Sequence, residues 1–318
     1  MNHNKTLIVI AGPTASGKTA IAIQLAKHYN TVILSADSRQ FYREMSIGTA
    51  KPTDEELADV KHYFINSHSI TETFTVGDFE RACVDLLSEL FKQHDKVILV
   101  GGSGLYIKAV CEGFDHLPVA DTAIRSGLNN ELSEHGLTRL QDRLKLVDPV
   151  YYRSVDLNNP QRIIRALEVF EATGQPFSSY HKSLRIARPF NIIKIGLSWP
   201  REILYDRINQ RVDMMVQQGL IDEVRSLLPY KHLNALNTVG YTELFDYFDG
   251  KTDLVTCISL VKQNTRHFAK RQLTWFGKDN EIDWIDADKP DLKSNLIAIT
   301  KFDNTRNDIK SDIGNAIK

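Results

Sequence analysis

Residues 12–19 read GPTASGKT, a spacing of glycines, lysine and threonine that suits the binding of phosphate groups. In such a loop the glycines let successive backbone N–H groups point at an anion, while the lysine reaches the terminal phosphates and the threonine hydroxyl a bound Mg²⁺. The apolar run Leu7 to Ile10 precedes the loop and a helix-like stretch, Ala20 to Tyr29, follows it, which argues against a chance match in a Gly-rich turn. The predicted ligands of a di- or triphosphate are Gly12, Pro13, Thr14, Ala15, Ser16, Gly17, Lys18 and Thr19.

Asp37 is a candidate partner of this loop because it directly follows the apolar run Val32 to Leu34. Its carboxylate could act as a general base or metal partner beside a transferred group. It could equally cap a turn, as aspartates often do after strands. Position alone does not choose between these roles.

Two arginines, Arg207 and Arg211, lie one helical turn apart and could capture a diphosphate, for which the planar guanidinium is well suited. The alternative is a pair of surface ion pairs with Asp206 or Asp213. Both interpretations remain open from the sequence.

Short apolar runs separated by helical patterns predict an α/β fold, a P-loop parallel-sheet core flanked by helices. The runs are Leu7–Ile10, Val32–Leu34, Lys96–Val100 and Asn191–Leu197. Ligands of such sheets lie beyond the carboxyl ends of the strands, so the segments that follow the runs have priority. An ATP-hydrolysing enzyme usually carries an acidic residue there, but Lys96–Val100 ends in two glycines, which counts against routine ATP chemistry.

The strand signal vanishes between residues 118 and 188, which predicts an all-helical insertion domain. Asn159 and Pro160 are typical of a helix start, and Gly174 and Pro176 of its end. The predicted division is a first part of the core at 1–117, the insertion at 118–188, a second part of the core with C-terminal helices at 189–303, and a frayed tail at 304–318.

The composition, 42% hydrophobic and 25% charged among 318 residues with a formal net charge of −1, is that of a soluble protein with a real core. Its three cysteines are too scattered for a disulfide framework or a zinc site and are expected to be core thiols. No stretch is long and apolar enough to span a membrane, and the N-terminal apolar run is too short for a signal peptide. A cytoplasmic protein without membrane association is expected.

Two segments are locally basic, residues 161–194 and 262–278. The second contains no acid, and Lys262, Arg266 and Lys270 would form one positive stripe on a helix with aromatic residues interleaved. A solvated helix face explains either segment by itself. Two of them in a chain of net charge −1 indicate a polyanionic partner.

Taken together, these segments resemble the tRNA dimethylallyltransferases, or tRNA isopentenyltransferases. The matching pieces are GPTASGKT, DSRQFYREMSIGTAKPT from 37, GGSGLY from 101, NPQRIIRALEV from 159, RINQRVDMMVQQGLIDEV from 207, VGYTEL from 239 and TRHFAKRQLTWF from 265. They keep the family's order and span nearly the whole chain, which is identified as a bacterial-type member. Ser103 departs from the family's usual threonine but keeps the hydroxyl, and the scattered cysteines do not match the zinc finger of eukaryotic relatives.

The resemblance implies transfer of a dimethylallyl group from dimethylallyl diphosphate to the N6 amine of the adenosine just 3′ of the anticodon, with Mg²⁺ as cofactor and diphosphate as product. It implies catalytic roles for Asp37 as the base, and for Thr19 and Arg211 at the diphosphate, with Thr19 at the metal. The residues implied to contact the tRNA anticodon stem-loop are Asp37, Ser38, Arg39, Gln40, Ser103, Arg125, Gln161, Arg162, Ile163, Ile164 and Arg165. A monomer is expected.

Two other functions remain open from the residues alone. A small-molecule kinase would bind ATP at the same loop, and a nucleotide-dependent RNA-binding switch would bind without transfer chemistry. Label transfer from dimethylallyl diphosphate to tRNA, without ATP turnover, separates all three.

Overall fold

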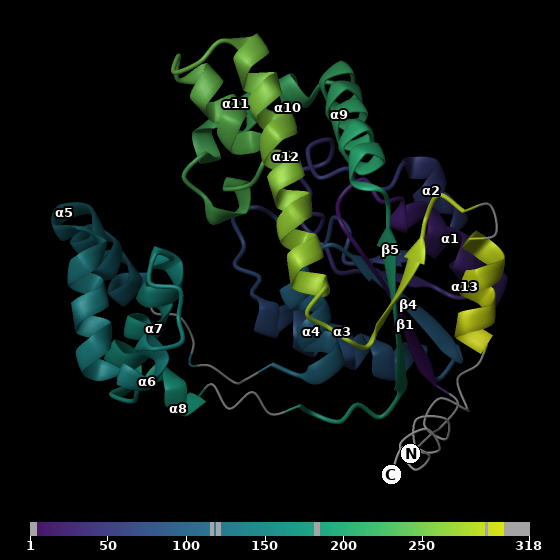
Figure 1. Ribbon diagram of the computed structural model, residues 1–318, viewed down its shortest axis with the longest axis horizontal. Coiled ribbons are helices and arrows are strands. Elements are labelled where there is room, and N and C mark those ends of the chain that lie inside the picture. Colours follow the sequence, from purple (N-terminus) through teal and green to yellow (C-terminus); the bar gives the residue numbers. More distant parts are fainter. Residues whose placement is uncertain (1–4, 115–117, 119–121, 181–184, 290–291, 302–318) are drawn as a thin grey trace. The chain divides into compact units, whose positions relative to one another are not determined.

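The computed structural model describes residues 5–114, 118, 122–180, 185–289 and 292–301 (Figure 1). The strands are β1 (Thr6–Ala11), β2 (Ile33–Ser35), β3 (His62–Tyr63), β4 (Lys96–Gly101), β5 (Asn191–Ser198) and β6 (Ile282–Asp286). The helices are α1 (Lys18–Tyr29), α2 (Asp54–Asp59), α3 (Val76–Leu90), α4 (Gly104–Glu112), α5 (Thr122–Val147), α6 (Pro149–Tyr152), α7 (Pro160–Thr173), α8 (Phe177–Tyr180), α9 (Arg201–Gln217), α10 (Leu220–Ser226), α11 (Tyr241–Phe248), α12 (Leu254–Phe276) and α13 (Leu292–Lys301). The predicted tail at 304–318 lies outside the described residues.

All six strands form one parallel sheet in the order β3-β2-β4-β1-β5-β6. Strand β1 lies between β4 and β5, so that Ile8 pairs with Ile98 on one side and with Ile193 on the other. Every residue of β1 is buried, as expected for a central parallel strand with both faces covered. The predicted α/β core with a parallel sheet is confirmed.

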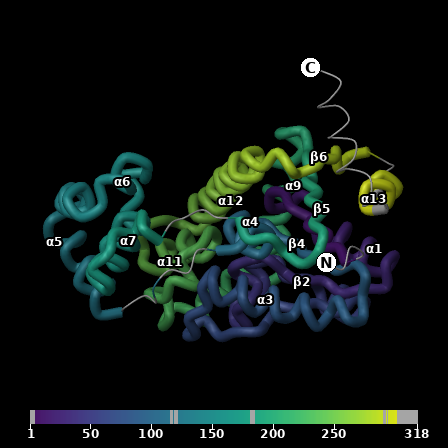
Figure 2. The backbone as a smooth tube through the Cα atoms, turned by 90° about the horizontal axis from the view of Figure 1, so that it is seen from below, coloured from purple at the N-terminus to yellow at the C-terminus, as the bar shows by residue number. Residues whose placement is uncertain are grey.

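Helices cover both faces of the sheet, and alternate residues of each central strand point to opposite layers. On one face α3 and α4 pack over Leu7 and Val97. On the other face α1 and α13 pack over Ile8 and Ile98. Figure 2 shows β6 beside β5 at one end of this sheet, where the chain passes on to α13.

A further apolar cluster lies beyond the sheet, where helices α9 to α12 gather (Figure 1). It joins Val212 of α9 and Tyr241 of α11 to Tyr42 and Met45 from the segment after β2. The side chains of the three cysteines are buried, as expected of core thiols. Within the described part of the chain, no helix is long and apolar enough to cross a membrane.

Residues Glu112–Ala187 form a second compact unit, inserted between β4 and β5 of the first. Its described elements are helical, with Leu140, Ile163 and Leu167 in its core. Helix α7 begins and ends where its capping residues predict: the Asn159 side chain accepts a hydrogen bond from the Arg162 N–H at 3.2 Å, and Gly174 ends the helix at φ 70°.

Candidate active site

A cavity of about 550 Å³ opens beyond the carboxyl ends of β1, β2 and β4. Thr14, Asp37 and Ser103, which follow these three strands, line one side of it. Side chains of α9 and α12, among them Arg211 and Gln272, line the other. The segments that follow β1, β2 and β4 therefore meet at one site, as the geometry of parallel sheets predicts.

The phosphate loop needs glycine at two points. Gly12 has φ 147°, and a Cβ there would lie 3.0 Å from the carbonyl oxygen of Leu197 in the neighbouring strand β5. Gly17 has φ 87° and stands at the start of α1, whose first backbone N–H groups have no acceptor within the helix. A second cavity of about 340 Å³ borders the loop and shares Lys18, Thr19 and Arg211 with the first, so both spaces reach the same donors.

The Lys18 side chain is half-buried, and its Nζ donates to the carbonyl oxygen of Pro13 at 2.6 Å. Burial and the Arg211 guanidinium lower the pKa of Lys18 and the Asp37 carboxylate raises it, which together leave a pKa of about 7. At neutral pH the Lys18 side chain is therefore only partly protonated. An anion bound beside it would raise its pKa and make protonation complete.

Arg207 holds the phosphate loop through a backbone carbonyl of the loop. Its Nε donates to the carbonyl oxygen of Ala15 at 2.9 Å, and its guanidinium lies 4.5 Å from the centre of the Trp199 ring. Trp199 itself donates to the carbonyl oxygen of Ser16 at 2.9 Å. The surface ion-pair interpretation is therefore wrong for Arg207, and Asp213 pairs with Lys262 instead.

Arg211 lies one turn further along α9 and lines both cavities. Burial lowers its pKa and the neighbouring Asp37 carboxylate raises it. A half-buried guanidinium that borders two cavities, close to a lysine, creates a positive field that a diphosphate would neutralise.

Asp37 forms a turn contact and also lines the cavity. Its Oδ1 accepts the N–H of Arg39 at 2.9 Å, which is the local turn of an aspartate after a strand. The same side chain lines the cavity and interacts with the charges of Lys18 and Arg211. The turn thus fixes the carboxylate at the cavity without removing it from the site.

The other predicted residues of this segment hold neighbouring loops together. Ser38 N–H donates to Ser103 Oγ at 2.9 Å, which joins the end of β2 to the end of β4. Gln40 Nε2 donates to the carbonyl oxygens of Thr49 and Ala50 at 3.2 and 3.1 Å. Arg39 reaches the carbonyl oxygen of Asn237 at 3.2 Å, and all of Ser38, Arg39, Gln40 and Ser103 line the cavity.

The glycines after β4 are required by crowding. A Cβ on Gly101 would clash with the carbonyl oxygen of Ala36, and one on Gly102 would clash with the side-chain amide of Gln272. The side chain of an acidic residue, of the kind that ATP-hydrolysing enzymes place here, has no room at Gly101 and would displace the Gln272 amide at Gly102.

Replacing Gly101 by alanine should lower the free energy of unfolding by about 1–3 kcal/mol, the usual cost of overpacking, because its Cβ meets a fixed backbone atom. The measurement is urea unfolding followed by circular dichroism. Gly127 is the matched control: it lies in α5 with open space around a Cβ, so alanine there should be neutral or stabilise by up to about 1 kcal/mol. Equal stability of the two variants would contradict the crowding argument.

Gln272 is a site residue that the sequence analysis did not single out. Its Oε1 accepts the N–H of Thr14 at 2.8 Å and its Nε2 donates to the carbonyl oxygen of Gly102 at 2.9 Å. It therefore ties the phosphate loop to the loop after β4, and it occupies one loop amide within the protein. The only sequence signal was its place in the stretch TRHFAKRQLTWF.

The residues predicted to contact tRNA from α7 differ in what they present. Ile163 and Ile164 are fully buried in the core of the helical unit, so their side chains are not a surface for RNA. Arg165 and Arg125 both bind the buried carboxylate of Glu168, at 2.9 and 3.3 Å. The remaining members are exposed: Gln161, which accepts from Arg125 at 2.7 Å, and Arg162.

The two basic segments contain several charges that serve the fold. Arg188 is buried and binds Glu80 at 2.5 Å, and Lys194 binds Asp279 at 2.7 Å. Arg266 donates to Asn209 at 2.6 Å. Internal pairing therefore explains part of the positive excess, and Lys182 lies outside the described residues.

Comparison with known proteins places this geometry in a family. A family model described as IPP transferase matches residues 40–279. A tRNA dimethylallyltransferase of Christiangramia forsetii is 56% identical over 283 residues, covering 89% of this chain and 94% of the relative. The chain belongs to the IPP transferase family.

Solved structures of similar proteins agree with the membership. The tRNA isopentenylpyrophosphate transferase of Bacillus halodurans is 38% identical, with a TM-score of 0.70 over 98% of this chain and 99% of that one. A eukaryotic dimethylallyltransferase solved in the course of acting on tRNA is 25% identical, with a TM-score of 0.75 over 97% of this chain and 80% of that one. The IPP transferase match thus extends from the sheet core through the inserted helical unit.

Proposed function

We propose that this IPP transferase moves a dimethylallyl group from dimethylallyl diphosphate to tRNA, at the N6 amine of the adenosine immediately 3′ of the anticodon. The observation that carries the proposal is one cavity lined both by groups that can donate to a diphosphate and by a carboxylate. Lys18, Thr19 and Arg211 are the groups that would bind the diphosphate, and Asp37 is the carboxylate. The kinase alternative is disfavoured by Gly101, where the Ala36 backbone leaves no room for the side chain of a metal-binding acid.

Asp37 is the proposed proton acceptor. An exocyclic adenine amine is a weak nucleophile because its lone pair is delocalised into the ring, so its proton must leave as the bond to carbon forms. The Asp37 carboxylate is held by the Arg39 N–H through one oxygen, which leaves the other oxygen to receive that proton. The cations Lys18 and Arg211 nearby keep the carboxylate in a positive field.

The leaving diphosphate gains charge as its bond to the prenyl carbon breaks, and that charge requires donors already in place. The N-terminal amides of α1, the Lys18 ammonium and the Arg211 guanidinium supply them. Arg207 and Trp199 contribute indirectly, because their hydrogen bonds to Ala15 and Ser16 fix the loop that presents these amides.

Mg²⁺ is the proposed cofactor, held through few protein ligands and mainly through the diphosphate. No group of three or more His, Cys, Asp or Glu side chains able to hold a metal occurs among the residues that the structure describes. The Thr19 hydroxyl at the cavity fits a cation of this type, which usually keeps water and substrate phosphates in its shell. When bound, the ion would neutralise charge on the diphosphate.

The acceptor adenine has to leave its stack to enter the cavity, as bases do in other base-modifying enzymes. We assign the loop of Ser38 to Gln40, together with Ser103, to contact with the flipped nucleotide, because these residues line the cavity. The helical unit is proposed to bind the anticodon stem-loop through its exposed polar residues. We propose that the enzyme acts as a monomer, and tRNA as substrate implies action in the cytoplasm.

The test is transfer of label from dimethylallyl diphosphate to an anticodon stem-loop, with ATP turnover measured in parallel. We expect label in RNA, release of diphosphate and no ATP hydrolysis. Turnover of ATP without label in RNA would replace the proposal by a kinase or a nucleotide-dependent switch. Thermal stabilisation gives an independent comparison, since dimethylallyl diphosphate with Mg²⁺ should stabilise the protein more than ATP with Mg²⁺ does.

The helical unit offers a test of RNA binding through Arg162, which is exposed on α7. Arg162→Ala should raise KM for tRNA and lower the slope of log affinity against log salt by about 0.7–0.9, the value for one lost phosphate contact. Affinity for dimethylallyl diphosphate should stay unchanged. The matched control is Lys145→Ala, an exposed cation on α5 of the same unit. Identical slopes for wild type and Arg162→Ala would remove this arginine from the RNA interface.

A further inference from the structure

The Glu223 carboxylate on α10 binds three successive backbone N–H groups of another segment. Its Oε2 accepts from Ser46 and Ile47 at 2.9 and 2.7 Å, and its Oε1 accepts from Gly48 at 2.9 Å. Three consecutive amides that converge on one anion form a nest, a concave backbone arrangement that binds anions. The nest occupant here is a side chain from 175 to 177 residues further along the chain.

Tyr241 completes the same contact from α11. Its hydroxyl donates to Glu223 Oε1 at 2.6 Å, and burial together with the carboxylate raises the pKa of Tyr241, so the hydroxyl keeps its proton. The ring lies so close to Gly48 that a Cβ there would be 2.5 Å from a ring carbon. Glu223 and Tyr241 therefore hold residues 46–48 by hydrogen bonds and by exact steric fit.

This segment is part of the cavity wall. The cavity is lined in part by Gly48, Thr49 and Ala50. The side-chain amide of Gln40 donates to the carbonyl oxygens of Thr49 and Ala50. Gln40 stands three residues after Asp37 and is itself held by Ser35 Oγ at 3.0 Å. A displacement of residues 46–50 would thus pass through Gln40 to the turn that fixes the Asp37 carboxylate.

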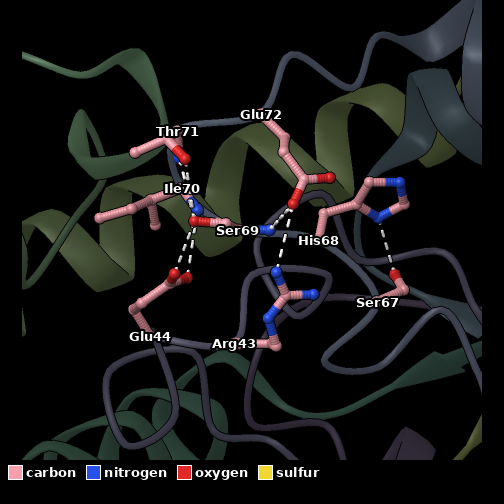
Figure 3. A network of polar contacts seen from close by, with 8 residues as sticks. All are labelled: Arg43, Glu44, Ser67, His68, Ser69, Ile70, Thr71 and Glu72. Carbon is pink, nitrogen blue, oxygen red and sulfur yellow. Dashed lines mark hydrogen bonds and ion pairs between the residues drawn. The ribbon is translucent and has the colours of Figure 1, made fainter.

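The opposite side of the same segment is held by a second polar network (Figure 3). Glu44 accepts from Ser69 Oγ at 2.7 Å and from the Ile70 N–H at 3.1 Å, while Arg43 binds Glu72 at 3.2 Å. These contacts fix residues 43 and 44 to residues 69–72. Residues 46–48 are held by Glu223. Residues 43–50 are therefore anchored at their start by this network, at residues 46–48 by Glu223, and at Thr49 and Ala50 by Gln40.

We propose that Glu223 is a positioning residue for prenyl transfer, which fixes the wall of residues 46–50 and through it the turn of Asp37. It touches neither substrate nor metal. The expected loss of kcat rests on the proposed function. The expected change in hydrogen exchange at residues 46–48 does not depend on that function.

The test is Glu223→Gln, which replaces one of the two accepting oxygens by an NH₂ group that opposes the backbone N–H donors. We expect kcat per active site to fall about tenfold or more, with active sites counted by binding of dimethylallyl diphosphate. Affinity for that diphosphate should be unchanged, because Lys18, Thr19 and Arg211 lie outside the segment. Hydrogen exchange at the amides of residues 46–48 should be slow in wild type and fast in the variant.

Two further variants separate positioning from general damage. Gly48→Ala pushes the same wall away from the Tyr241 ring without changing Glu223, and it should reproduce the fall in kcat. Asp222→Asn changes the neighbouring carboxylate, an exposed side chain paired with Arg225, and should behave as wild type.

Normal kcat in Glu223→Gln alongside fast exchange at residues 46–48 would overturn the positioning role. So would slow exchange in the variant, because the nest would then stand without the carboxylate. If wild type transfers no label to tRNA, the proposed function fails instead, and the exchange measurement still decides whether Glu223 holds the wall.

Discussion

Replacing Asp37 by asparagine should lower kcat for prenyl transfer by about two to four orders of magnitude, the range for a lost general base. Asparagine keeps the size of the side chain and an oxygen for the Arg39 N–H, so the turn should survive. It has no basic oxygen to receive the proton from the adenine amine. The effect should fall on kcat, because the base acts in the transition state and not in binding of the donor.

The measurement is single-turnover transfer with both substrates saturating, together with the Kd of dimethylallyl diphosphate. It should be made near pH 6, because Asp37 raises the pKa of Lys18 and its removal would otherwise also discharge that lysine. An unchanged Kd with a large loss of kcat supports the role of base. Near-normal turnover would reduce Asp37 to a turn residue.

Lys18 should make binding of the diphosphate depend on pH. Its pKa of about 7 in the free protein means that the ammonium is half charged at pH 7 and nearly fully charged only well below that pH. From about pH 8 upward the charged fraction falls by about tenfold per unit, and affinity for the diphosphate should fall with it, down to the level of a protein without this charge. Binding at pH 8 should take up a proton, since the diphosphate restores the ammonium form.

Lys18→Ala should remove this pH dependence and slow transfer by about 10²–10³-fold, the cost of losing one donor to developing charge. Lys18→Arg is the matched control, because its charge persists throughout the same range. The measurement is calorimetric titration of dimethylallyl diphosphate between pH 6 and 9 in buffers of different ionisation enthalpy. If affinity still falls above pH 7 in Lys18→Ala, the pH dependence belongs to another group.

Local signals account for the part of the fold that could be predicted. The four central strands were evident because strands buried on both faces must be apolar throughout, as in Leu7 to Ile10. Helix α7 was evident because Asn159, Pro160 and Gly174 act within one turn of its ends. Strands β3 and β6 were not predicted: β3 has two residues, and β6 is an edge strand with an exposed Trp284.

The residues of the candidate site also differ in whether a local sequence signal marks them. The phosphate loop and Asp37 could be predicted because each follows its own strand, so a local motif gives its position. Gln272 and Glu223 could not, because their partners lie far away in the sequence and neither belongs to a motif with a known chemical role. Ile163 and Ile164 were included at the RNA contact although their side chains are buried, since a resemblance over a whole segment does not distinguish its buried residues from its exposed ones.

The placement of the helical unit between β4 and β5 has a consequence for synthesis of the chain. Strand β1 is made first, but the partner of its second edge, β5, follows only after residues 112–187 have been added. The helical unit is contiguous in sequence and its contacts are local, so it can fold while the sheet is still incomplete. During that interval the nascent chain exposes an unpaired apolar strand edge, the kind of surface that recruits other chains. The ribosome-bound half-sheet, and not the finished enzyme, is therefore the state of this protein in greatest need of a chaperone.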